Sequence, residues 1–106
     1  MTRDEFIDEK APQLAFYAKA YLKDQIEFAE IQHYLWDTLE EWQFHNYQGD
    51  AQTDMERVFW HLLHSFDRWP DWVIRGNQFL RGQIDGYCDY LSLGGRTPQN
   101  CVGVSP

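Results

Sequence analysis

Histidines and carboxylates in helical spacing are the residues of this chain that come closest to a metal site. Glu30 and His33 have the Glu-x-x-His spacing of di-iron carboxylate bundles, which need two such motifs and two further inward carboxylates. The chain has one such motif, and helical geometry places it opposite the apolar stripe of its segment. His61 and His64 lie one turn apart but have no third ligand near them in sequence. We therefore expect no bound metal or cofactor. The alternative is a metal- or small-ligand-binding bundle that uses His33, His61 or His64.

Catalytic patterns are missing from the sequence. It contains no nucleophile beside a base, no glycine-rich phosphate loop and no Ser/His/Asp arrangement, so we expect a protein that is not an enzyme. Cys88 and Cys101 have no Cys-x-x-Cys spacing and make no zinc site on their own. We expect both to be reduced. The alternative is a disulfide that ties the tail to the preceding helix.

Acidic side chains gather along one line of the second predicted helix. Four carboxylates and a tyrosine lie there: Glu27, Glu30, Tyr34, Asp37 and Glu41. Lys19 and Lys23, just upstream, are the bases expected to offset them. Such a face is either an ordinary solvated surface or a docking site for a basic protein, since inhibitors of basic nucleases use acidic helices with tyrosines.

Several aromatic rings fall outside the predicted apolar stripes. They are Phe16, Trp36, Phe44, Tyr47 and Trp60. Rings at a surface are enriched in interfaces, although a wide or two-sided core explains them equally well. A helical wheel places Trp60 near Glu56, His64 and Asp67. We therefore expect another chain, a neighbouring helix, or the Arg96–Pro106 tail to cover it, with Val102 and Val104 against it.

These residues must be positioned by helices. The 3.6-residue periodicity predicts an all-α, single-domain bundle of about four helices over residues 3–23, 25–45, 54–68 and 70–93, followed by an irregular tail over 94–106. Capping boxes are expected to begin the first three at Thr2, Asp24 and Thr53. Pro12 should kink or split the first helix near Ala11. Short connections favour an up-and-down bundle, with an orthogonal arrangement as the alternative.

The apolar stripes predict which side chains pack together. We expect Leu35, Leu39, Leu62, Phe66 and Phe79 to be buried in one core. Gly82 and Gly86 share a face of the last helix and would let the first helix or a second subunit approach closely. Alternatively, Arg75-Gly76-Asn77 breaks that helix into two pieces.

Composition narrows the possible partners of this 106-residue chain. It has 9 Lys and Arg against 17 Asp and Glu, for a net charge of -8, which argues against nucleic acid and anionic membranes. The N-terminus lacks a secretory signal and no apolar run reaches membrane-spanning length, so we expect a soluble, cytoplasmic protein.

The function that fits best is a non-enzymatic interaction module for a protein partner or a homodimer. An immunity- or inhibitor-type protein that masks a basic partner is the alternative. The candidate interface consists of Trp60, Phe16, Trp36, Tyr34, Glu27, Glu30, Asp37 and Glu41.

Overall fold

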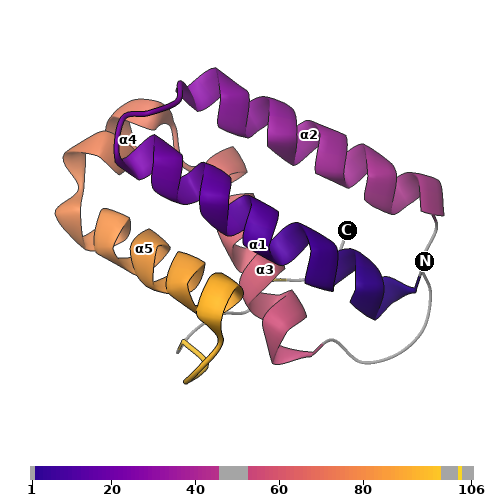
Figure 1. The fold of residues 1–106 in the computed structure, drawn as a ribbon. Coiled ribbons are helices and arrows are strands. Elements are labelled where there is room, and N and C mark those ends of the chain that lie inside the picture. The colour runs from indigo at the N-terminus through magenta and orange to yellow at the C-terminus, as the bar shows by residue number, and fades with distance from the viewer. Residues whose placement is uncertain (1, 46–52, 99–102, 104–106) are drawn as a thin grey trace.

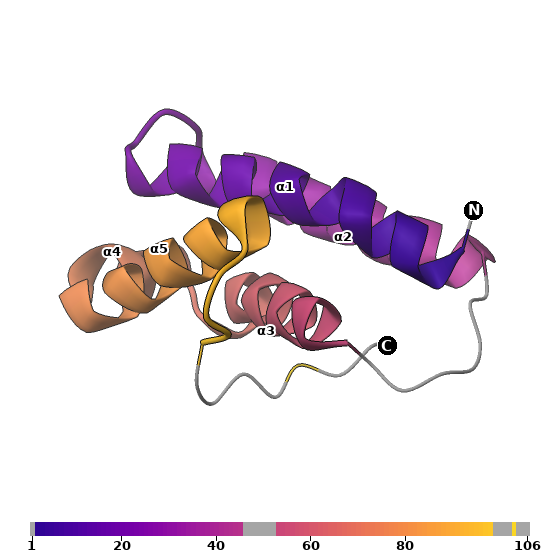
Figure 2. The same cartoon turned by 60° about the horizontal axis from the view of Figure 1, so that its bottom comes forward.

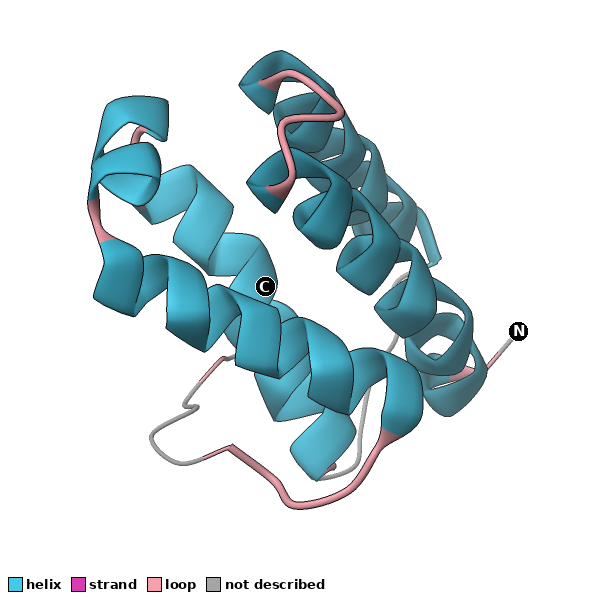
Figure 3. Ribbon diagram, turned by 60° about the vertical axis from the view of Figure 1, so that its left-hand side comes forward, coloured by secondary structure: helices cyan, strands magenta, loops and turns pink. Residues whose placement is uncertain are grey.

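Five helices make up most of the structure, a computed structural model that describes residues 2–45, 53–98 and 103. Figure 1 labels them in chain order. They are α1 (Arg3–Leu22), α2 (Phe28–His45), α3 (Asp54–Arg68), α4 (Asp71–Gly76) and α5 (Gln78–Leu93). Every residue within the described ranges is helix or loop, without a strand (Figure 3), which confirms the predicted all-α class.

The helices form two layers. α1 and α2 run antiparallel as a hairpin in one layer, and α3, α4 and α5 make up the other (Figure 2). α1 contacts α2, α3 and α5, and its contact with α5 is the most extensive. The short α4 lies at the same end of the molecule as the loop between α1 and α2 (Figures 1 and 3). The hairpin therefore covers the core from one side.

Two of the three predicted caps are found. The Oγ1 atom of Thr2 accepts a hydrogen bond from the backbone N–H of Glu5 at 3.1 Å, and that of Thr53 from Glu56 at 3.2 Å. The predicted cap at Asp24 is wrong. Asp24 lies in the turn after α1 with a φ of 58°, a left-handed conformation that Asp adopts more readily than most residues.

Pro12 does not divide α1. The helix runs unbroken from Arg3 to Leu22, so the predicted split near Ala11 does not occur, and the proline ring faces solvent. The stripe predicted for this helix is buried throughout: Ile7, Ala11, Leu14, Ala18 and Tyr21. Burial of this stripe offsets the one helical hydrogen bond that the proline removes.

The last predicted helix is broken at Asn77. This residue ends α4, and its side-chain oxygen accepts the backbone N–H of Leu80 at 3.0 Å, so it also caps α5. The alternative in which Arg75-Gly76-Asn77 interrupts the helix is thus correct. Gly82 and Gly86 are exposed, and no atom of the described residues comes within 4 Å of a Cβ built there, so they do not bring α1 close.

The hydrophobic core combines residues from every helix. Leu35, Leu62 and Phe66 are buried as predicted, and Leu39 is partly buried against them. The prediction for Phe79 is wrong, because 76% of its surface is exposed. The stripe was drawn on one continuous helix, whereas the break at Asn77 changes the rotational phase at which α5 begins.

Trp60 lies in the core rather than at the surface, in contrast to the prediction. Its exposed fraction is 0%, and its ring packs edge-on against Trp42 and Phe59, with centroid distances of 4.9 and 4.8 Å. The helical wheel placed it beside Glu56, but that carboxylate is itself buried. α3 packs against α1, α2 and α5, so its buried face is wider than one stripe.

Gly103 brings the tail into contact with α3. It is buried, and a Cβ at this position would lie 2.2 Å from the backbone nitrogen of His61 and 2.4 Å from the carbonyl oxygen of Arg57. The tail alternative for covering Trp60 rested on Val102 and Val104, which lie outside the described residues. At Gly103 itself, the close approach requires a residue without a side chain.

Replacing Gly103 with alanine is expected to destabilise the protein by about 1–3 kcal/mol, because the new methyl group must displace backbone of α3 or of the tail. Urea unfolding followed by circular dichroism measures this loss. Gly86→Ala is the matched control, because the same methyl group meets open space in a helix interior. It should stabilise by up to about 1 kcal/mol. Equal effects at both positions would contradict the contact between Gly103 and α3.

Candidate interaction surfaces

The exposed side of α2 carries both carboxylates and large rings. It turns away from Ile31, Leu35 and Trp42, which are buried. We call it the α2 outer face and define it by its exposed residues: Glu30, His33, Trp36, Asp37, Glu40, Glu41 and Phe44. The rings of Trp36 and Phe44 are 57% and 84% exposed, far more than rings of a folded core.

A shallow depression marks the C-terminal half of this face. It has a volume of about 350 Å³ and is lined by Asp37, Glu40, Glu41 and Phe44. Three carboxylates beside one phenyl ring suit a cationic group. A guanidinium or ammonium group can pair with carboxylates and interact with the face of an aromatic ring at the same time.

Ion pairs with α1 and α5 differ from those expected for the acidic line. Glu41 pairs with Lys10 of α1 at 2.7 Å. Lys19, which was expected to offset this line, instead binds Asp89 of α5 at 2.5 Å and lies 3.5 Å from Asp85. Glu41 remains half exposed beside Lys10, and Glu27 is exposed just before α2 begins. The acidic line is therefore largely uncompensated within the described part of the chain.

Tyr34 and Phe16 do not belong to the α2 outer face. The hydroxyl of Tyr34 donates to the backbone oxygen of Lys10 at 3.1 Å, and its ring stacks on Tyr17 at 4.8 Å between centroids. Burial raises the pKa of this hydroxyl well above its usual range. Phe16 is 72% exposed on α1, where it lines a separate depression of about 330 Å³ with Lys19 and others. Tyr34 thus holds α1 against α2, and Phe16 lies apart.

α3 carries a second exposed line, of basic type. Its members recur at helical spacing, and we call them the α3 stripe: Arg57, His61, His64 and Arg68. The arginines are exposed and the histidines partly buried. His61 contacts the edge of Tyr87, and His64 stacks on Trp60. Burial lowers the pKa of His61, and the positive charges of Arg68 and His64 lower it further. The sequence analysis considered the histidine pair and missed the arginines that extend it.

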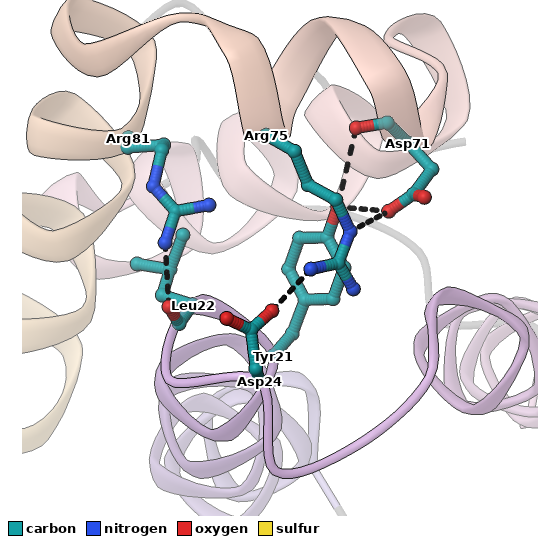
Figure 4. A network of polar contacts seen from close by, with 6 residues as sticks. All are labelled: Tyr21, Leu22, Asp24, Asp71, Arg75 and Arg81. Carbon is teal, nitrogen blue, oxygen red and sulfur yellow. Dashed lines mark hydrogen bonds and ion pairs between the residues drawn. The ribbon is translucent and has the colours of Figure 1, made fainter.

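A polar network joins the α1–α2 loop to α4 (Figure 4). The buried Tyr21 hydroxyl donates to Asp71 at 2.5 Å, and Arg75 bridges Asp71 and Asp24. Arg81 closes the same end by donating to the Leu22 carbonyl oxygen at 2.5 Å. The hydrogen bond from Tyr21 lowers the pKa of Asp71, with Arg75 adding to the effect, while burial raises that of Tyr21. These groups satisfy one another, so the network anchors α4.

Comparison with known proteins gives no homologue for these surfaces. No protein-family model, curated protein sequence or solved structure matches the chain. The argument for function therefore depends on the geometry of the residues themselves.

The metal and thiol candidates have no supporting geometry. Glu30 and His33 point to solvent, and within residues 2–45, 53–98 and 103 no group of three or more His, Cys, Asp or Glu side chains could hold a metal ion. Cys88 is buried, and burial raises the pKa of its thiol to about 12, so it stays protonated at neutral pH. Cys101, its predicted alternative disulfide partner, lies outside the described residues.

Membrane insertion finds no support in the helices. None of those within the described ranges has the length and hydropathy required to cross a bilayer.

Proposed function

We propose that this protein is a non-enzymatic interaction module that binds a basic protein segment through the α2 outer face. The observation that carries the proposal is the combination of Trp36 and Phe44, both exposed, with four exposed carboxylates on the same helix face. Either feature alone is common on protein surfaces. Together they offer the apolar contact and the charge pairing that an arginine-containing segment needs.

Charge and ring exposure act on different aspects of binding. The net charge of -8 draws a basic partner in and raises its association rate, most strongly at low salt. Burial of Trp36 and Phe44 supplies affinity that salt does not screen, since apolar contact depends on area removed from water. An inhibitor that masks a basic enzyme is one form of this function, and it would use the same face.

A labelled peptide of alternating arginine and glycine is a suitable probe. Fluorescence anisotropy should report binding that weakens as salt is raised. The variant Asp37→Asn/Glu40→Gln is expected to bind about fivefold more weakly, because each exposed charge pair contributes up to about 1 kcal/mol. Trp36→Ala should weaken binding about tenfold and abolish any blue shift in tryptophan emission.

The matched control removes two carboxylates from elsewhere on the surface. Asp8→Asn/Glu9→Gln changes the net charge by the same amount on the exposed side of α1. It should leave most of the binding intact. If control and α2 variants lose affinity equally, the peptide senses net charge alone, and the α2 outer face is not the site.

A further inference from the structure

Most basic side chains of this protein are engaged within the chain. Arg3 pairs with Glu56, Lys10 with Glu41, Lys19 with the aspartates of α5, and Arg75 with Asp24 and Asp71. Arg81 donates to a backbone carbonyl of α1. Arg57 and Arg68 differ, because no carboxylate in the described part of the chain pairs with either of them. They lie at the two ends of the α3 stripe.

The α3 stripe and the α2 outer face match in length. Eleven residues separate Arg57 from Arg68, and eleven separate Glu30 from Glu41. At a rise of 1.5 Å per residue, each pair of ends spans about 16 Å along its helix. Glu41 keeps about half of its surface exposed beside Lys10, so it can accept a second cation.

The internal spacings match as well. In an antiparallel pairing of the two helices, Glu41 lies opposite Arg57 and Glu30 opposite Arg68. Asp37 then falls opposite His61, because four residues separate each from the same end of its line. Every carboxylate along the line faces a basic residue, and like charges are not brought together.

The two surfaces cannot meet within one molecule. Each lies on the outer side of its own helix, opposite side chains that are buried in the common core. A contact between them therefore needs two molecules. Because the surfaces are different, each molecule would use its α2 outer face against one neighbour and present its α3 stripe to another. Such an interface is heterologous, or head-to-tail.

We infer that the α2 outer face of one copy docks on the α3 stripe of a second copy. This inference rests on the proposed function, since it assigns a basic partner to the same face. The partner is a folded helix of this chain, with Arg57 and Arg68 as the cations. Trp36 and Phe44 would lie along the margins of the contact, where guanidinium groups can stack on them.

Mixing two disabled variants tests the head-to-tail arrangement. Glu30→Gln/Asp37→Asn/Glu40→Gln disables the α2 outer face, and Arg57→Gln/Arg68→Gln disables the α3 stripe. In sedimentation velocity at low salt, the parent should associate with increasing concentration, and each variant alone should associate at least about tenfold more weakly. A mixture of the two should form a one-to-one dimer and nothing larger, because each partner retains one working surface.

Charge-matched controls exclude a general effect of net charge. Asp8→Asn/Glu9→Gln and Lys23→Gln/Arg96→Gln change exposed residues outside both surfaces and should associate like the parent. Circular dichroism establishes that every variant is folded.

Two outcomes would overturn the inference. A parent that stays monomeric at low salt, while still binding the arginine peptide, removes the second copy as partner and leaves the proposed function standing. Association that persists in both disabled variants would assign it to another surface, such as exposed Phe79 and Leu93 of α5. Loss of peptide binding and self-association together would remove the proposed function as well.

Discussion

Replacing Arg3 with methionine is expected to lower the free energy of unfolding by about 3 kcal/mol or more. Arg3 forms a two-pronged pair with Glu56, with Nε to Oε1 at 2.7 Å and Nη2 to Oε2 at 2.5 Å. The Glu56 side chain is 1% exposed, so the variant leaves a carboxylate buried without its cation. Arg3 also lies over the Trp42 ring at 5.4 Å. Urea unfolding measures the loss.

A second substitution separates the pair from the packing around it. Arg3→Met/Glu56→Met removes both charges and should recover most of the lost stability, since burying neither ion avoids the cost of removing it from water. Lys10→Met is the control, because it breaks the half-exposed pair with Glu41 and should cost under about 1 kcal/mol. Equal losses for Arg3→Met and Lys10→Met would show that burial of Glu56 adds nothing.

Local signals predicted the helices where one residue determines the outcome. Thr2 and Thr53 cap their helices because a hydroxyl reaches a backbone N–H three residues on, and that geometry needs no tertiary contact. The same reasoning misplaced the start of α2. Asp24 had the composition of a capping box, but it lies in a left-handed turn and binds Arg75, which is distant in sequence. Tertiary contacts decided that position.

Errors in burial came from treating each helix as amphipathic. The apolar stripe of α3 was correct, but Glu56 and Trp60 beside it are buried too, because three other helices surround α3. A helical wheel cannot show that a carboxylate will meet an arginine from the start of α1. Phe79 was misplaced for a different reason, since the wheel assumed no break at Asn77.

The candidate site was predicted in part. Helical spacing was enough to place Glu30, Asp37 and Trp36 on the exposed side of α2. The pairing of cations was not predictable, because Lys10 and Lys19 bind residues far along the chain. Which arginines stay without a carboxylate partner follows from those pairings. The α3 stripe could have been found from its spacing, whereas its unpaired state required the structure.

Truncating Trp60 to alanine is expected to cost about 3–5 kcal/mol, a large share of the 5–15 kcal/mol that usually stabilises a domain. The ring is fully buried between Trp42 and Phe59, so its loss leaves a cavity that helices on several sides cannot close. Trp60→Phe should cost much less. It keeps an aromatic ring, and the indole N–H that it removes has no hydrogen-bond partner among the described residues.

Trp36→Ala provides the contrast on the α2 outer face. This ring is 57% exposed, so its removal should change the free energy of unfolding by less than about 1 kcal/mol while weakening binding of the arginine peptide. Trp60→Ala should do the reverse, because at temperatures where it remains folded it leaves the α2 outer face intact. Urea unfolding and peptide anisotropy, measured on both variants, separate the two roles. A Trp60→Ala protein as stable as the parent but unable to bind would place Trp60 in the interface instead of the core.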